Sequence, residues 1–430
     1  MSAIKYSKEL FDFIKKSPTA SHAVNTVRVS LFEQGYTELK EGAAWSLSNG
    51  GKYFTVKNGT SIIAFRYNDS ASGFSIVASH SDSPAFKVKA SGVSACGAYT
   101  TLPTEKYGGM IMYSWLDRPL SIAGRVVVRT ESGVKSMLLN IDRDLLVIPS
   151  LAIHLNRGVN SGFSPNPAKD MIPLLSVWGE EVNLNSLIAG ELGVSADYVI
   201  SHDLFLYVRE EGRCVGLNGE LLLSPRLDDL ACVYSSMEAF LEGGETDMIP
   251  VLAVFDNEEI GSDTKQGAAS AFLESTLMRI IPDNEKYLRA LATSFMISAD
   301  NAHAKHPNHP ELSDAQNAPV INGGVVIKYN ANQKYATDGV SSAVFSRICE
   351  LAGVNTQSYC NRADLPGGST LGSIANTKVS VYTVDIGLPQ LAMHSAVETA
   401  GVYDVESLIL ALSRLYSSSI VINGDEITIK

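Results

Sequence analysis

An uninterrupted apolar run at residues 249–255, followed directly by acidic residues, constrains the fold more than any other feature of this sequence. The run reads Ile-Pro-Val-Leu-Ala-Val-Phe, and Asp256-Asn257-Glu258-Glu259 comes next. A short apolar run without alternation is typical of a strand buried on both faces, as in a parallel sheet. Ligands of open α/β sheets bind beyond the carboxyl ends of such strands. We therefore expect an α/β fold with Glu258 and Glu259 at a site on one sheet edge.

Glu258 and Glu259 have two possible explanations. Two neighbouring carboxylates at a sheet edge repel each other and lose hydration, and a metal ion compensates for both effects. One carboxylate then coordinates the ion, and the other stays free to accept a proton from water. Alternatively, the pair begins a solvated helix, where acidic side chains suit the helix dipole. This motif alone leaves both explanations open.

Other polar residues occupy equivalent positions along the chain. They are His80 after an apolar strand at 74–78, Asp300 after 295–298, His394 after a strand at 379–386 and a short turn, and Asp228 at the start of an amphipathic helix that Gly243-Gly244 ends. Singly, each has an ordinary explanation, such as a helix N-cap, a core histidine or a turn. Together they supply two imidazoles and several carboxylates, a set suited to Zn, Co or Mn. The combination favours a metal site.

The chain is too long for one typical hydrophobic core, because it has 430 residues. Residues 88–215 are rich in predicted strands, including a hairpin at 124–130 and 134–141, and lack crossover helices. Alternation of helices and strands resumes after Gly216. We expect a discontinuous α/β catalytic domain of residues 1–87 and 216–430, with a β-rich domain of residues 88–215 inserted into it.

Charge and cysteine usage limit the partners and the compartment. The net charge of −12 argues against nucleic acid and anionic membranes as partners, since both favour basic surfaces. No apolar run approaches a transmembrane span, and the first residues lack the apolar core of a signal peptide. Five cysteines without a CxxC pair fit free thiols in a reducing compartment. We expect a cytoplasmic protein.

Short motifs along nearly the whole chain resemble the aspartyl aminopeptidase family, which includes vacuolar aminopeptidase I. They lie at residues 13–24 (with Ser-Pro-Thr-Ala-Ser-His), 79–84 (Ser-His-Ser-Asp-Ser-Pro), 148–154, 298–303, 333–337 and 391–395 (Leu-Ala-Met-His-Ser). The resemblance implies a mixed-sheet metallopeptidase catalytic domain with an inserted β-rich dimerisation domain. It also implies a homo-oligomer built from dimers, up to a dodecameric tetrahedron.

The resemblance also implies roles for individual residues. Two divalent metal ions, Zn with Co or Mn as alternatives, would be held by His80, Asp228, Glu259, Asp300 and His394, with Asp228 bridging. Glu258 would be the general base, and Asp82 would orient His80. The substrate would lie among His154, His303, Lys328 and Tyr335. His154 is open between a substrate contact supplied by the neighbouring subunit and a metal ligand. Lys328 is open between a counter-charge for an acidic substrate and a solvated lysine at a strand end.

The expected function is a two-metal aminopeptidase that removes N-terminal acidic residues, Asp or Glu, from peptides. One alternative is a carboxypeptidase or deacylase with the same metal chemistry. Such an enzyme needs a cationic clamp for a carboxylate, which Arg226 or Arg362 would have to provide. The other alternative is a non-catalytic assembly protein, which loss of Glu258 or of a ligand would indicate. The sequence retains all of them.

Overall fold

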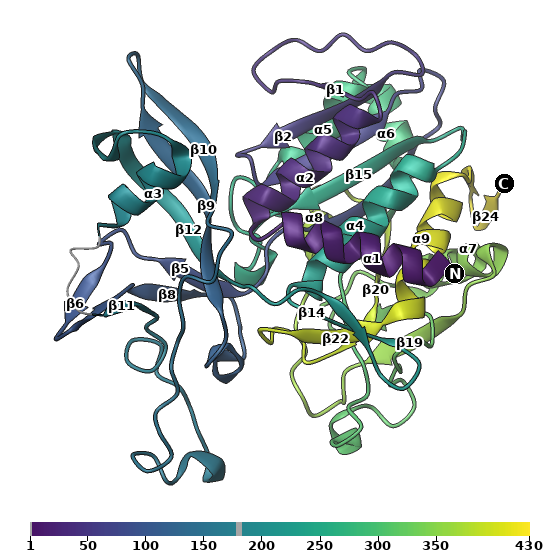
Figure 1. Ribbon diagram of the computed structural model, residues 1–430. Helices are drawn as coiled ribbons and strands as arrows, with labels where there is room; N and C mark the ends of the chain where they lie inside the picture. Colours follow the sequence, from purple (N-terminus) through teal and green to yellow (C-terminus); the bar gives the residue numbers. More distant parts are fainter. Residues whose placement is uncertain (1, 178–182) are drawn as a thin grey trace.

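The computed structural model describes residues 2–177 and 183–430 and shows a large α/β unit beside a smaller β-rich unit (Figure 1). A nine-stranded mixed sheet forms the centre of the α/β unit. In spatial order its strands are β1 Thr37–Glu38, β2 Lys52–Lys57, β3 Ser61–Arg66, β15 Ile249–Phe255, β4 Phe74–His80, β16 Phe295–Ala299, β20 Tyr382–Gly387, β18 Val325–Tyr329 and β19 Thr356–Cys360.

Strands β15, β4, β16 and β20 run parallel at the middle of this sheet. Strand β15 pairs in parallel with β4 but antiparallel with β3. The prediction that residues 249–255 form a strand of a parallel sheet is therefore correct for the β4 side and wrong for the β3 side. The strand predicted from residue 379 begins only at Tyr382. Both differences leave the carboxyl ends of the four central strands at one edge.

Helices cover both faces of the central sheet, because its inner strands are apolar on both sides. Val251 and Ala253 of β15 pack on one face, and Leu252 and Val254 pack on the other, which is the alternation of a pleated strand. The first face is covered by α5 Phe272–Ile280, α6 Asn284–Ala292 and α8 Leu371–Ala375. The second is covered by α1 Ser2–Lys16, α2 Ala20–Glu33, α4 Leu227–Glu242, α7 Gly339–Ala352 and α9 Val402–Tyr416.

The β-rich unit has its own hydrophobic core. Its five-stranded antiparallel sheet consists of β10 Val134–Asn140, β9 Leu120–Arg129, β12 Val199–Val208, β5 Ala85–Val88 and β8 Thr104–Tyr107. The β-rich unit also contains β6 Ser94–Cys96, β7 Tyr99–Thr101, β11 Leu174–Val177 and helix α3 Leu184–Leu192. The predicted hairpin is confirmed as the antiparallel pair β9 and β10. The β-rich unit was expected to begin at residue 88, but strand β5, which begins at Ala85, already belongs to its sheet.

Short strands at the junction complete the architecture. A second five-stranded sheet contains β13 Arg213–Val215, β14 Leu221–Ser224, β22 Glu398–Gly401, β21 Pro389–Leu391 and β17 Ala302–His303. Because β13 pairs with β14, residues 213–215 join the α/β unit and not the β-rich unit. A hairpin of β23 Ile420–Asn423 and β24 Glu426–Ile429 follows α9. Within residues 2–177 and 183–430, no helix has the length and apolar character needed to span a bilayer.

Candidate metal centre

The parallel strands bring distant acidic and histidine residues to one edge of the central sheet. His80, the last residue of β4, lies in register with Phe255 of β15, so the acidic segment after β15 begins beside it. On the other side of β4, strand β16 ends directly before Asp300. Helix α4 starts at the same edge with Asp228 and Asp229, whose backbone angles are not helical. Asp228 is therefore not the N-cap of a regular helix.

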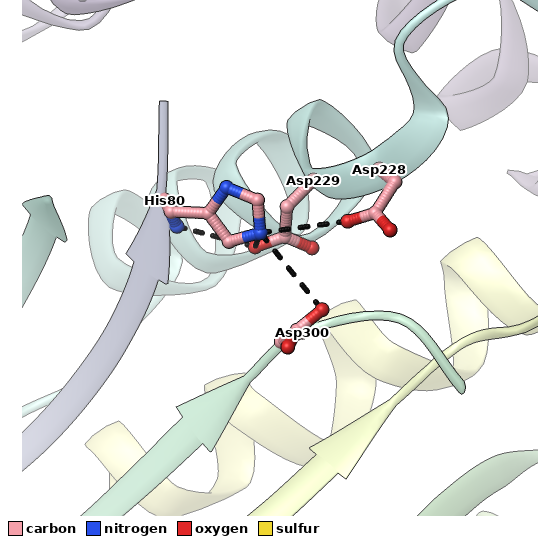
Figure 2. Close-up of side chains that lie close together, drawn as sticks. All are labelled: His80, Asp228, Asp229 and Asp300. Atoms are coloured by element: carbon pink, nitrogen blue, oxygen red, sulfur yellow. Dashed lines mark hydrogen bonds and ion pairs between the residues drawn. The ribbon is translucent and has the colours of Figure 1, made fainter. Parts of the chain in front are cut away.

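Figure 2 shows the first group of side chains, in which three carboxylates surround one imidazole nitrogen. His80 Nε2 lies 3.4 Å from Asp228 Oδ1 and 3.9 Å from both Asp229 Oδ2 and Asp300 Oδ1. The same oxygen of Asp229 accepts a hydrogen bond from the backbone N–H of His80, at 3.2 Å. All four residues are buried.

A second group adjoins the first through Asp228. His394 Nε2 lies 3.5 Å from Asp228 Oδ2 and 3.3 Å from Glu259 Oε1. The two carboxylate oxygens of Asp228 thus face two different imidazoles. Asp228 Oδ1 and Glu259 Oε1 are buried and have no hydrogen-bond partner among the described residues. The five predicted ligands are therefore brought together, and Asp228 lies between the two halves.

The spacing of these atoms fits bound metal ions better than hydrogen bonds. Ligand atoms about 2.0–2.2 Å from one tetrahedral zinc ion lie roughly 3.3–3.6 Å from each other. The closest nitrogen–oxygen distances, 3.3 to 3.5 Å, fall in this range. Nitrogen and oxygen donors are also the ligand types that zinc prefers. The buried carboxylate oxygens of Asp228 and Glu259 have no hydrogen-bond partner in the described part of the chain and need a cation. The residues present therefore fit bound zinc ions.

The far nitrogen of each imidazole has an oxygen partner that fixes the ring. His80 Nδ1 lies 3.1 Å from the carbonyl oxygen of Asp82 and 3.4 Å from its Oδ1. His394 Nδ1 lies 2.7 Å from the carbonyl oxygen of Gly109. Such contacts orient ligating imidazoles, because a proton held on Nδ1 leaves the Nε2 lone pair free. Both Nε2 atoms consequently point at the carboxylates.

Burial and crowded negative charge perturb the acids of the site. Burial, with Asp300 and Glu259 nearby, raises the pKa of Glu258 to about 9 even though His80 opposes the shift. Burial also raises the pKa of Glu259 to about 7 against the effect of His394. For Asp228 the two imidazoles outweigh burial and lower the pKa. Perturbed carboxyl groups gathered in this way are typical of functional sites.

The residues predicted around the substrate have different positions. The solvated explanation of Lys328 is wrong, because the residue is only 2% exposed. Its Nζ donates to Asn301 O at 3.0 Å and lies 3.5 Å from Asp300 Oδ2. The buried Tyr335 ring lies 5.4 Å from this Nζ. His303 on β17 is exposed, with its ring 6.0 Å from that of Tyr359.

His154 is exposed in the β-rich unit and belongs to none of the ligand groups formed by the described residues. The arginine clamp required by the carboxypeptidase alternative is also not at the centre. Arg362 is paired with Asp364, and half-buried Arg226 donates to the backbone oxygen of Ile14. Neither arginine is in a described ligand group of the centre.

Sequence reasoning missed several buried residues that support the ligands. Glu398 accepts hydrogen bonds from the backbone N–H groups of Asp228, at 3.0 Å, and His394, at 2.7 Å. Asn301 donates to Leu227 O at 2.9 Å, which links the segment after β16 to the start of α4. Asp229, which belongs to the first ligand group, is another such residue. A charged residue within the apolar segment 396–402 was the available signal for Glu398.

Comparison with known proteins gives matches over almost the full length. The family model described as "Aminopeptidase I zinc metalloprotease (M18)" matches residues 13–416. A probable M18 family aminopeptidase 2 of Clostridium acetobutylicum is 46% identical over 415 residues, covering 93% of this chain and 96% of the relative. The corresponding protein of Pseudomonas aeruginosa PAO1 is 39% identical over 419 residues, covering 95% and 97%.

Solved structures agree with these matches. The structure described as the Ape4 and Nbr1 complex gives a TM-score of 0.94 at 35% identity, covering 96% of this chain and 86% of the other. The S. cerevisiae mApe1 dodecamer gives a TM-score of 0.84 at 28% identity, covering 95% and 96%. The mixed α/β architecture is therefore the one these structures share.

Proposed function

This chain belongs to the M18 family of aminopeptidase I zinc metalloproteases and is a metallo-aminopeptidase; on that basis we propose that it uses two metal ions to remove N-terminal Asp or Glu from peptides. The observation that carries the proposal of two ions is the position of Asp228. Its two oxygens face separate imidazoles, and each imidazole has a further carboxylate beside it. One carboxylate is thus placed to serve both halves of the site.

The ligand groups suggest which residues would hold each ion. His80, Asp228 and Asp300 would hold one, and Asp228, Glu259 and His394 would hold the other. When bound, such ions polarise the scissile carbonyl and lower the pKa of water, so that attack becomes possible near neutral pH. Zinc is the ion named by the family description, and Co or Mn suits the same donors.

Glu258 is the proposed general base. Its backbone N–H donates to Asp82 Oδ1 at 3.2 Å, which fixes the turn that carries its side chain. The carboxylate takes a proton from the attacking water and passes it to the leaving amine. Burial raises the pKa of Glu258 to about 9 and so favours the protonated form, which allows the side chain to hold the proton between the two transfers.

A substitution at Glu258 tests the proposed mechanism. Glu258→Gln keeps the shape of the side chain but cannot accept the proton, so we expect kcat to fall at least ~100-fold with both ions retained. The measurements are peptide cleavage and metal content. Near-normal turnover in this variant would contradict the assigned role. Acetylated peptides should resist the wild-type enzyme, since an aminopeptidase requires a free N-terminus.

The acidic preference is motivated by Lys328. This cation is buried next to Asp300 and Tyr335 at the candidate centre, and an acidic first side chain would find its counter-charge there. Substrates with N-terminal Asp or Glu should exceed those with Leu in kcat/KM. Lys328→Ala should narrow that difference, whereas the control Lys305→Ala, at an exposed position, should not. A wild-type preference for Leu would refute the specificity and leave the metallo-aminopeptidase assignment intact.

Assembly and location complete the proposal. The exposed Leu151, Ile153 and Leu155 flank His154 in the β-rich unit, which suits an interface between subunits. We propose that this unit forms dimers, that His154 reaches the neighbour's substrate, and that dimers build a dodecamer like that described for mApe1. All five cysteines are free, which supports a location in the reducing cytoplasm.

A further inference from the structure

Residues 107–111, here called the bridging segment, leave the end of β8 and pass directly beside the candidate metal centre. Tyr107 Oη donates to Asp82 Oδ2 at 2.6 Å and accepts a hydrogen bond from Asn257 Nδ2 at 2.9 Å. The carbonyl oxygen of Gly109 accepts from His394 Nδ1 at 2.7 Å, and the N–H of Ile111 donates to the His394 carbonyl at 2.9 Å. A single segment of the β-rich unit therefore contacts both imidazole-bearing parts of the centre.

Asp82 connects the tyrosine to the acidic turn. Its Oδ1 accepts the backbone N–H of Glu258 and its Oδ2 that of Glu259, both at 3.2 Å. The phenol of Tyr107 is the third donor to this carboxylate. Burial and the charge of Asp82 raise the pKa of Tyr107, so its hydroxyl stays protonated as a donor. The position of Asp82, and with it the turn carrying Glu258, depends on these three hydrogen bonds.

Packing around the phenol is incomplete, which increases the importance of the hydrogen bonds. A cavity of about 290 Å³ lies between the β-rich unit and the central sheet. Tyr107, Asp82, Asn257, Asp228 and His394 all contribute to its walls. A carboxylate beside such a space is not held by close packing on every side, and directional hydrogen bonds must fix its orientation.

We propose that Tyr107 is a positioning residue of the metal centre, acting through Asp82 on the Glu258–Glu259 turn. The β-rich unit then completes the catalytic site of its own subunit, apart from any part it has in assembly. The inference rests on the proposed function, since it assigns to Tyr107 the orientation of the general base and of one ligand.

The test removes the hydroxyl and keeps the ring. Tyr107→Phe preserves the edge-to-face contact with Phe205, whose ring centroid is 5.6 Å away. We expect a ~10–100-fold loss of kcat at saturating zinc, the usual cost of losing a group that orients a metal ligand, with KM within about threefold. Tyr113→Phe is the matched control, because Tyr113 is 61% exposed in the same unit.

Two further readouts separate positioning from a general structural effect. In the protein without metal, backbone amide exchange at residues 257–260 should become about tenfold faster in Tyr107→Phe, because a hydrogen bond that fixes the turn is lost. In a double-mutant cycle, Tyr107→Phe should cost little in an Asp82→Asn background, because both changes break one connection.

Three results would overturn the inference. These are an unchanged kcat in Tyr107→Phe, unchanged exchange at 257–260, and additive losses in the double mutant. The Glu258→Gln variant shows whether the positioning role of Tyr107 or the proposed function itself is wrong. If Glu258→Gln is inactive while Tyr107→Phe is normal, only the positioning role is wrong. If Glu258→Gln is active, the proposed mechanism is wrong.

Discussion

Metal binding at this centre should displace protons, because the same groups attract protons when no cation is present. Burial lowers the affinity of the His394 imidazole for a proton, but Asp228 and Glu259 outweigh it and raise its pKa to about 12. The pKa of Glu258 is raised to about 9 and that of Glu259 to about 7, in both cases chiefly by burial. A ligating imidazole must be neutral and a ligating carboxylate ionised, and a nearby cation also favours ionisation of Glu258.

The number of protons follows from these pKa values. At pH 7 in the absence of metal, His80, His394 and Glu258 each carry a proton and Glu259 carries about half of one. Full occupancy should therefore release about three to four protons per subunit. Since binding releases protons, affinity rises with pH. The product of the two apparent metal-binding constants should increase roughly 10³–10⁴-fold for each pH unit near neutrality, by linkage.

Calorimetric titration of the metal-free protein with zinc, in buffers of different ionisation enthalpy, measures the released protons directly. Glu258→Gln should lower the count by about one, because glutamine carries no ionisable proton. Glu131→Gln, at an exposed position, should leave it unchanged. Release of less than one proton by the wild type, or an identical count in Glu258→Gln, would refute this account of the electrostatics.

Three further predictions test other parts of the molecule. Asp228→Asn should lose metal from both halves of the centre, so elemental analysis showing full occupancy would contradict the bridging position. His154→Ala and Glu258→Gln should each be nearly inactive, and a purified hybrid of the two should recover up to about half of wild-type activity by site counting in a two-fold dimer. No recovery would place His154 in its own chain's site. Tyr416→Phe removes a buried hydrogen bond to Val251 O, 3.0 Å long, and should lower the free energy of unfolding by ~1–2 kcal/mol in denaturant titrations; an unchanged value would exclude that contribution.

The part of the site that sequence could predict is the part built on strand ends. His80 ends one apolar strand and Glu259 and Asp300 follow two others, and parallel strands place such residues at a common edge whatever the rest of the chain does. Glu398 and Asn301 could not be found in this way. Each acts through backbone groups of segments far away in the sequence, and those partners are known only once the chain is folded.

Fold predictions succeeded and failed for similar reasons. The apolar pattern of residues 249–255 located β15 correctly, but pattern alone does not show which way a neighbouring strand runs, and β3 is antiparallel. Lys328 follows three buried residues of β18, and the local sequence is compatible with both a counter-charge for substrate and a solvated lysine. Its burial depends on a counter-charge from Asp300, which the local sequence does not contain.

The order of strands in the central sheet has a consequence for biosynthesis. The middle strands β15, β4, β16 and β20 are neighbours in space, yet β4 is synthesised long before the other three. The core of the β-rich unit comes from residues 85–208 except for a contribution at Ala396 and Val397, so most of it can form while the rest is still being translated. Of the proposed ligands, His80 is synthesised first and His394 last. With these ligands, the metal centre can be completed only near the end of translation.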